Sequence, residues 1–156
     1  MALDRTLLLF PLLAMVVVGL VSSESAAEKF RRQHVDTNGL DFDDNTYCNQ
    51  MMKSRGMTKG SCKVFNTFIM ESILKIQAIC WNKKLPCKHK FFNCHMSGEP
   101  LKVTECQVKG NSKDSPCKYK TRNDKKCVIV ACHGWPPLPV HLDSSKGDSC
   151  QGQPSI

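Results

Sequence analysis

The sequence Cys127-Val128-Ile129-Val130-Ala131-Cys132 decides the fold class of this chain. Its four central residues are apolar and three of them are β-branched, which is typical of a buried strand. Residues 138–143 alternate between apolar and polar from Pro139 onward, which predicts a second strand with one polar face. Short runs at 101–107 and 118–122 predict two more strands, so we expect the C-terminal part of the chain to form a sheet.

The part of the chain that precedes Cys80 has helical periodicity instead. Residues 26–35 place Phe30 and His34 four apart on one face of a helix. Residues 46–55 suit a second helix that ends at Gly56, because glycine is favoured just beyond a helix C-terminus. Residues 66–79 suit a third helix, since isoleucine recurs at positions 69, 73, 76 and 79. Helices first and strands later predict an α+β domain with an antiparallel sheet.

Ten cysteines lie in this chain of 156 residues, and all of them follow residue 47. Such a density indicates an oxidising compartment and a small domain that disulfides stabilise. No Cys-x-x-Cys occurs, which argues against zinc ribbons and thioredoxin-like redox motifs. The residues alone leave the pairing of the cysteines open.

The N-terminus reads as a secretory signal. Residues 7–21 are mostly apolar, but about 15 residues fall short of the roughly 20 that a membrane span needs. Small residues follow at 22 and 23, so we predict that residues 1–23 are cleaved and that the protein is secreted to the extracellular space. An uncleaved signal anchor is the alternative.

The charge of the chain is strongly uneven. The formal net charge is +8, with a net of −3 over residues 1–44 and of +11 over residues 45–156. A basic body of this kind attracts polyanions, among them RNA, DNA, heparan sulfate and anionic membranes. The balance of 41% hydrophobic and 23% charged residues excludes a wholly disordered chain and a polytopic membrane protein.

Three short stretches supply groups for catalysis: Gln33-His34-Val35-Asp36, residues 62–68 (CKVFNTF) and Pro139-Val140-His141-Leu142-Asp143. Together they hold two imidazoles, an ammonium group and a carboxylate that can orient one imidazole. Transphosphorylation of RNA needs a base, an acid and a cation for the charge that grows on the phosphoryl oxygens. Two histidines that titrate near neutral pH and one lysine suit these tasks. This chemistry requires no metal or cofactor, and we expect none.

These motifs resemble those of the pancreatic-type secretory ribonucleases, in the ribonuclease A superfamily. The signature Cys-Lys-x-x-Asn-Thr-Phe is met by residues 62–68, and residues 47–55 (YCNQMMKSR) are similar to the pancreatic branch. The resemblance extends from Lys29 to Asp143. It implies a disulfide-stapled α+β fold in which three short N-terminal helices pack on a bent antiparallel sheet. The implied organisation is a ribonuclease A-like domain over residues 24–143 and a C-terminal extension over 144–156.

The resemblance also implies a role for each catalytic group. His34 would be the general base and His141 the general acid for cyclisation, with the roles reversed when the 2′,3′-cyclic phosphate is hydrolysed. Lys63 would stabilise the transition state. The implied substrate is single-stranded RNA, cleaved on the 3′ side of pyrimidines.

Eight further residues are implied to bind the substrate or to support its binding. Thr67 would bind the pyrimidine, and Glu105 would tune this contact. Asn93 would bind the downstream base and Gln33 the scissile phosphate, while Asp143 would orient His141. Three basic residues would bind the neighbouring phosphates: Lys29, Arg32 and Lys88. Glu105 stands where the family has aspartate, which leaves the balance of cytosine and uracil open. Phe91 and His133 also depart from the family, which leaves the downstream base open. His89, His95 and His133 are expected at the surface rather than as catalysts.

The family pairing of cysteines implies four disulfides: Cys48–Cys106, Cys62–Cys117, Cys80–Cys132 and Cys87–Cys94. Cys127 and Cys150 have no counterpart in the family. We predict that they form a fifth bridge that pins the C-terminal extension of a monomer. A bridge between two chains is the alternative.

A second class of function stays open at this point. Cationic members of the superfamily act in host defence, so binding to a membrane or another polyanion is the alternative to RNA cleavage. An anionic cell surface and the ribonuclease inhibitor, a partner of the family, are further candidate partners.

Overall fold

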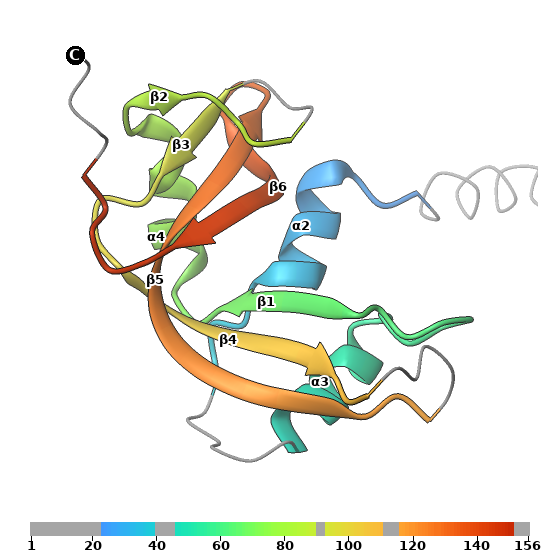
Figure 1. Cartoon of the computed structure of the whole chain (residues 1–156). Helices are drawn as coiled ribbons and strands as arrows, with labels where there is room; N and C mark the ends of the chain where they lie inside the picture. The colour runs from blue at the N-terminus through green and yellow to red at the C-terminus, as the bar shows by residue number, and fades with distance from the viewer. Residues whose placement is uncertain (1–22, 40–45, 90–92, 111–115, 152–156) are drawn as a thin grey trace, which may run out of the picture.

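The computed structural model describes residues 23–39, 46–89, 93–110 and 116–151 (Figure 1). The predicted signal sequence, apart from Ser23, lies outside these residues. Three helices occur within them: α2 (Ala26–His34), α3 (Thr46–Ser54) and α4 (Ile73–Ala78), which the short 3-10 helix η1 (Ile79–Trp81) extends. None of these helices has the length and the apolar character needed to cross a bilayer.

The strands form one antiparallel sheet in the order β1-β4-β5-β3-β2, with β6 paired to β5. They are β1 (Phe65–Ile69), β2 (Lys84–Leu85), β3 (Cys94–Met96), β4 (Leu101–Val108), β5 (Tyr119–His133) and β6 (Leu138–Lys146). The long strand β5 pairs with β4 through its first half and with β6 through its second half. Figure 1 shows that β5 bends strongly between these halves. The predicted α+β fold with three helices on a bent antiparallel sheet is therefore confirmed.

The prediction of a third helix over residues 66–79 is wrong in its first part. Residues Phe65–Ile69 form β1, which pairs with β4 from Phe65↔Gln107 to Ile69↔Val103. The helix begins only after Ser72, whose side chain accepts a hydrogen bond from the N–H of Lys75 (3.2 Å). The isoleucine periodicity misled because Ile69 is buried by sheet pairing rather than by a helix face. The strands predicted at 118–122 and 127–132 are parts of the single strand β5.

Two apolar clusters hold the two halves of the bent sheet. One contains Phe30 of α2, Ile76 of α4 and Val130 of β5. The other contains Met52 of α3 and Tyr119 of β5. Since β5 contributes to both clusters, it fixes how the two halves face each other. Helix α2 packs against both halves, through β1 in one and β6 in the other.

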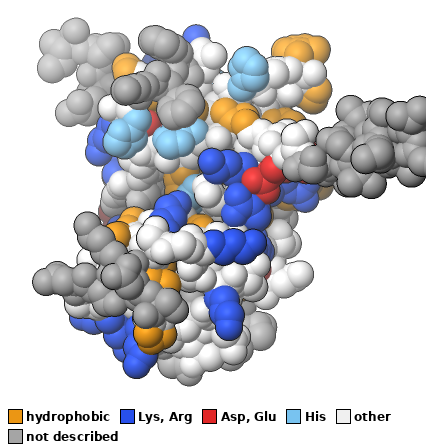
Figure 2. All heavy atoms as spheres, turned by 90° about the vertical axis from the view of Figure 1, so that its right-hand side faces the viewer, with side chains coloured by type: hydrophobic (Ala, Val, Ile, Leu, Met, Phe, Trp, Pro, Cys, Tyr) orange, Lys and Arg blue, Asp and Glu red, His pale blue; other side chains and the backbone are white. Residues whose placement is uncertain are grey.

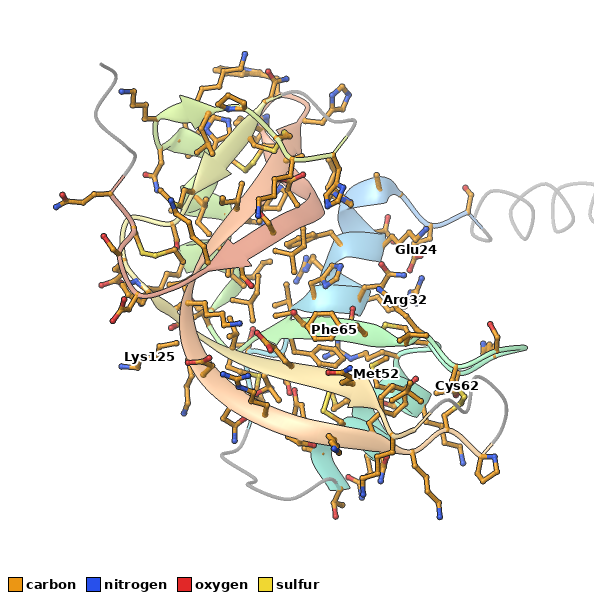
Figure 3. The ribbon with its side chains drawn as sticks, viewed as in Figure 1. Glu24, Arg32, Met52, Cys62, Phe65 and Lys125 are labelled. Carbon is orange, nitrogen blue, oxygen red and sulfur yellow. A yellow bond between two sulfur atoms is a disulfide. The ribbon has the colours of Figure 1, made fainter. Side chains whose placement is uncertain are left out.

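All ten cysteines are paired in the structure, and the pairs coincide with the five expected above. Cys48–Cys106 links α3 to β4, and Cys80–Cys132 links η1 to β5. Cys62, labelled in Figure 3, bonds to Cys117. Cys127–Cys150 ties the C-terminal extension to β5 within one chain. Each bridge restricts the unfolded chain, and loss of one native bridge typically costs about 2–5 kcal/mol of stability.

Candidate active site

His34 is the last residue of α2, and one of its ring nitrogens is hydrogen-bonded to the sheet. Its Nδ1 lies 2.9 Å from the carbonyl oxygen of Thr67 in β1. A carbonyl oxygen only accepts, so Nδ1 donates, and the neutral ring carries its lone pair on Nε2. The ring also packs against Phe30, with centroids 5.4 Å apart. His34 is therefore held in the tautomer that can take a proton at Nε2.

The end of α2 is itself fixed by an arginine that the sequence analysis did not single out. Nη1 of Arg55 donates to the carbonyl oxygens of Arg31, Arg32 and Val35 at 2.9–3.2 Å. Arg31 and Arg32 belong to the last turn of α2 and Val35 directly follows it, at the end where the regular backbone partners of helix carbonyls run out. The carbonyl of Arg31 also accepts from the backbone N–H of Val35 (3.1 Å). Arg55 therefore acts as a C-terminal cap that sets the position of His34.

Lys63 is positioned by a buried asparagine. Its Nζ donates to Oδ1 of Asn66 (3.0 Å), and Nδ2 of Asn66 donates to the carbonyl oxygen of Gln33 (2.8 Å). Asn66 is only 2% exposed. One side chain thus joins the ammonium group to the helix that carries His34. The family motif contains this asparagine, but only its burial and its two contacts identify it as a positioning residue.

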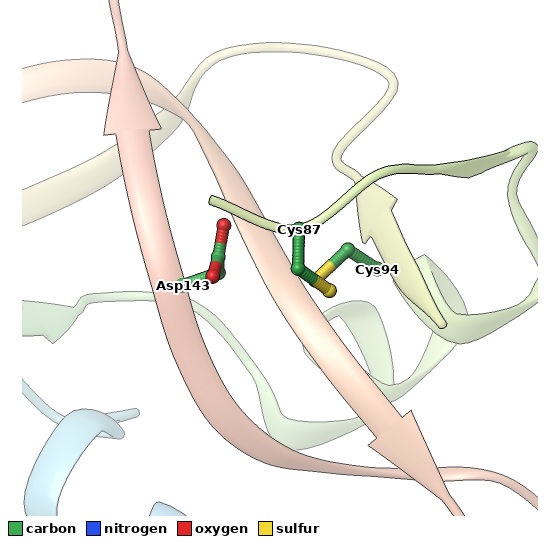
Figure 4. A group of neighbouring side chains, drawn as sticks. All are labelled: Cys87, Cys94 and Asp143. Atoms are coloured by element: carbon green, nitrogen blue, oxygen red, sulfur yellow. A yellow bond between two sulfur atoms is a disulfide. The ribbon is translucent and has the colours of Figure 1, made fainter. Parts of the chain in front are cut away.

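The second histidine stands on β6, and a buried carboxylate lies close to it. Asp143 accepts hydrogen bonds from the backbone N–H groups of Lys88 (2.8 Å) and His89 (3.0 Å). The disulfide Cys87–Cys94 holds this segment beside β6 (Figure 4). The ring of His89, exposed at the surface as expected, lies 6.2 Å from that of His141.

A cavity of about 200 Å³ brings the motif residues together. Its lining comes from α2, from the segment before β1, from β1 and from β6: His34, Lys63, Phe65, Asn66, Thr67, Leu142, Asp143, Ser144 and Ser145. His141 directly precedes the lining residue Leu142, and its charge acts on His34. Figure 2 shows this side of the molecule, with histidine side chains above a group of Lys and Arg side chains.

The electrostatics of the cavity keep both histidines neutral more readily than in water. Burial lowers the pKa of His34 to about 4; the Thr67 carbonyl opposes this shift, and the charges of Lys63 and His141 add to it. Burial also lowers the pKa of His141, whereas the carboxylate of Asp143 raises it. Burial and the charges of Lys29 and Arg32 lower the pKa of Lys63. These clustered positive groups favour an anion in the cavity.

The other predicted binding residues surround this centre. Lys29 lies exposed on α2, and Lys88 lies exposed beside Asp143. Arg32 is engaged by Glu24, through Nε to Oε2 at 2.8 Å and Nη2 to Oε1 at 2.9 Å, and the two side chains meet beside α2 in Figure 3. Asn93 is exposed with φ 68°, its carbonyl accepts from the N–H of Cys132, and it does not line the cavity.

Thr67 and Glu105, which the sequence analysis predicts to act together on the pyrimidine, have a third neighbour that it did not predict. Thr67 and Glu105 are directly opposite each other on β1 and β4. The carboxylate of Glu105 is paired with Nζ of Lys126 on β5 at 2.5 Å. Glu105 and Lys126 are 21 residues apart, so no local pattern pointed to this pair.

One group among the described residues has the geometry of a metal site. Cys87, Cys94 and Asp143 offer atoms within 4.8 Å of one another (Figure 4). Both sulfurs are consumed in the disulfide between Cys87 and Cys94. They therefore provide no thiolate for a metal, and the carboxylate already accepts two backbone hydrogen bonds.

Comparison with known proteins gives consistent matches. The family model described as pancreatic ribonuclease matches residues 25–143. The chain is 48% identical over 149 residues to the pancreatic ribonuclease of Leopoldamys edwardsi, covering 94% of this chain and 100% of the relative. It is 50% identical over 148 residues to that of Gerbillus nigeriae, covering 93% and 99%. Among solved structures, green turtle egg white ribonuclease matches with a TM-score of 0.68 and 39% identity, over 79% of this chain and 100% of that one.

Proposed function

The chain belongs to the pancreatic ribonuclease family and is an endoribonuclease, and on that premise we propose that it cleaves single-stranded RNA on the 3′ side of pyrimidines through a 2′,3′-cyclic phosphate. The observation that carries this proposal is the arrangement around the cavity. His34 directs Nε2 away from its hydrogen bond with Thr67, and Lys63 and Asp143 line the same space. These are the base, the cation and the orienting carboxylate that the reaction needs.

The first step is an intramolecular displacement at phosphorus. Nε2 of His34 removes the proton of the 2′-hydroxyl, and the 2′-oxygen forms a bond to phosphorus. The bond between phosphorus and the 5′-oxygen breaks, and His141 donates a proton to that departing oxygen. Because the pKa of His34 is lowered, this ring is neutral near pH 7 and ready to act as the base.

The second step runs the proton transfers in reverse. His141, now neutral, removes a proton from water, and the water oxygen attacks phosphorus in the cyclic phosphate. The bond to the 2′-oxygen breaks, and the protonated His34 returns its proton to that oxygen. Both histidines regain their starting states, so the cycle needs no further reactant.

Lys63 supports both steps by stabilising the charge on the phosphoryl oxygens. Asn66 holds its ammonium group, so the cation needs little rearrangement when the charge develops. The side chain of Gln33, whose carbonyl is bound by Asn66, is proposed to contact the same phosphate. Lys29, Arg32 and Lys88 are proposed to bind neighbouring phosphates, and Arg32 has to exchange part of its contact with Glu24 to do so.

Pyrimidine choice is assigned to Thr67, which lies at the wall of the cavity and is 5% exposed. Its N–H and hydroxyl offer one donor and one group that can donate or accept, which suits the edges of both cytosine and uracil. Glu105 is proposed to influence this contact from the adjacent strand, and Asn93 to contact the base after the cut.

We propose that the protein is secreted after cleavage near Ser23 and acts as a monomer. The apolar N-terminal run and the five disulfides support export to an oxidising compartment. The relatives named above are ribonucleases, and no observation favours the alternative of a host-defence protein that acts by binding alone.

The direct test is cleavage of poly(C) and of a cytidine-containing dinucleotide by His34→Ala and His141→Ala. Each substitution removes one proton-transfer group and is expected to reduce kcat by about 10²–10⁴-fold. His95→Gln is the matched control, because the ring of His95 contacts the carbonyl of Asn82 outside the cavity. Wild-type activity in His34→Ala would refute the mechanism.

A further inference from the structure

Both tryptophans of the chain lie at the surface and touch each other. Trp81 is 63% exposed and Trp135 is 86% exposed. Their ring centroids are 5.8 Å apart with an interplanar angle of 72°. Two large aromatic rings left in solvent side by side commonly mark an interaction site rather than a part of the core.

The positions of the two rings are set by covalent and backbone constraints. Trp81 ends η1 and directly follows Cys80, which is bonded to Cys132 in β5. Trp135 lies in the connection between β5 and β6, after Gly134 with φ 92°. The last ladder pair before this connection is His133↔Leu138. Trp135 therefore lies at the end of the β5–β6 hairpin, and the disulfide Cys80–Cys132 ties Trp81 of η1 to the same end.

The same hairpin carries the proposed general acid. His141 of β6 pairs with Ala131 of β5, and Trp135 follows four residues later along the chain. At about 3.3 Å per residue in an extended chain, Trp135 lies within about 13 Å of Ala131, the strand partner of His141. The exposed side chain of His133 lies between Ala131 and Trp135 in the sequence. In Figure 2 hydrophobic side chains gather at the upper right edge of the active-site face, next to a histidine.

The position of the tryptophan pair on the side of His141 indicates which part of a bound RNA lies nearest to it. His141 is proposed to protonate the 5′-oxygen of the departing nucleotide, so the RNA beyond the cut leaves the cavity on the side of His141. Bases stack on exposed aromatic rings with little regard to sequence. We propose that Trp81 and Trp135 form a stacking site for bases of single-stranded RNA that lie downstream of the cleaved bond, an inference that rests on the proposed function.

The surroundings of the pair favour RNA over a lipid surface. Leu74, exposed on the adjoining α4, would extend an apolar patch toward a membrane. The cation next to it, Lys75, is engaged by Glu71 and Glu99. The anionic headgroups of a membrane would therefore meet two carboxylates on that side. On the side of the cavity the pair instead adjoins His133 and the strand that carries His141.

Intrinsic fluorescence tests the proposal directly, because the chain's two tryptophans are both in the pair. The probes are 2′-deoxy oligonucleotides, which lack the attacking hydroxyl and are not cleaved. An octanucleotide with its single pyrimidine at the 5′ end is expected to quench the fluorescence at saturation, whereas a dinucleotide leaves it unchanged. Equal spectra with both probes would overturn the proposal. So would a blue shift with phosphatidylserine vesicles combined with no response to the octanucleotide.

Kinetics of Trp135 variants provide the second test. With a ribo-octanucleotide of the same design, Trp135→Ala is expected to lower kcat/KM at least about fivefold, while dinucleotide cleavage stays unchanged. Trp135→Phe should retain most of the activity, whereas Trp135→Leu, which keeps apolar area but no ring, should behave like alanine. Leu74→Ala is the matched exposed control and should have no effect.

The two proposals fail in different ways. If Trp135→Leu matches the wild type, or if Trp135→Ala slows both substrates equally, the stacking site is refuted while the cleavage mechanism stands. If the wild-type protein does not cleave the dinucleotide, the proposed mechanism fails. Quenching by the octanucleotide would then still support a binding site at the tryptophan pair.

Discussion

His34 lines the cavity and His141 directly precedes its lining residue Leu142, and the two regions that carry these histidines hold them differently. On the side of α2 each group has a direct partner: His34 contacts Thr67, and Lys63 contacts the buried Asn66. On the side of β6 the support comes through Asp143, which accepts hydrogen bonds from two backbone N–H groups and from the hydroxyl of Ser144. The disulfide Cys87–Cys94 ties that segment down. The side of α2, which carries the proposed base His34 (the base side), therefore depends on side-chain contacts in the core. The side of β6, which carries the proposed acid His141 (the acid side), depends on the short segment at Lys88 and His89 that the bridge Cys87–Cys94 holds.

The largest expected effect lies on the base side, at the cation. Lys63→Ala removes the ammonium group that we propose stabilises charge in the transition state, and it is expected to lower kcat by about 10²–10³-fold. Substrate affinity measured with a 2′-deoxy dinucleotide should change far less. Lys53→Ala, an exposed lysine on α3, is the matched control. Equal losses in kcat and affinity would show that Lys63 only attracts RNA.

The buried base should also make stability depend on pH. The pKa of His34 is lowered to about 4 in the folded chain, against about 6.5 when unfolded. Between these values the unfolded chain binds a proton that the native chain does not, so stability falls as pH is lowered through this window. The shift corresponds to about 3 kcal/mol at pH 4. The free energy of unfolding, measured in urea at pH 4 and pH 7, should therefore change less with pH in His34→Gln than in the wild type, by this amount. An identical pH dependence in both proteins would show that the pKa of His34 is not lowered in the folded chain.

Two disulfides offer a matched comparison on the acid side. Replacing Cys87 and Cys94 by serine opens a bridge with a sequence separation of 7, and replacing Cys127 and Cys150 opens one with a separation of 23. Each double variant is expected to lose roughly 2–4 kcal/mol of unfolding free energy in urea titrations. Only the first should also lower kcat, because it releases the segment that holds Asp143. A loss of kcat in the second would place the C-terminal extension in the site as well.

Asp143→Asn is expected to cost about tenfold in kcat/KM, a smaller loss than at Lys63. The amide oxygen can still accept one of the two backbone hydrogen bonds, but the negative charge that raises the pKa of His141 is lost. The basic limb of the pH profile should therefore move to lower pH, because His141 must be protonated to act as the acid. A profile with an unchanged basic limb would show that the carboxylate acts only on the fold.

The smallest expected effect concerns the choice between cytosine and uracil. Lys126 neutralises Glu105 on the strand next to Thr67. Lys126→Met frees this carboxylate to accept a hydrogen bond from the hydroxyl of Thr67. The hydroxyl oxygen can then only accept a hydrogen bond from the base, which favours uracil, because its ring N–H is a donor. We expect the ratio of uracil to cytosine cleavage to rise a few-fold, measured with paired dinucleotides. Lys125→Met, which changes the neighbouring exposed lysine, should leave the ratio unchanged.

Local patterns predicted much of the fold. Helices α2 and α3 and strands β4 and β6 lie where periodicity and the glycine stop placed them. Residues 66–69 were assigned wrongly because their strand character comes from pairing with β4, more than thirty residues away. Propensity over a short window contains no information on such distant partners.

The candidate site shows the same division. His34, Lys63 and Asp143 were found because the motifs name them, and the cavity brings them together. Arg55, Asn66 and Lys126 were missed as supporting residues, because their contacts join segments 20 to 33 residues apart. The tryptophan pair was missed for the same reason, since 54 positions separate two rings that Cys80–Cys132 brings into contact.

Whether His34 and His141 share one phosphate site can be measured by an NMR titration of the histidine rings, with and without cytidine 3′-monophosphate. We expect His34 to carry its proton on Nδ1 and its pKa to lie below the usual range in the free protein. We also expect the nucleotide, whose phosphate would lie between the rings, to raise the pKa of both His34 and His141. A nucleotide that shifts only one of the two, or neither, would contradict a shared phosphate site.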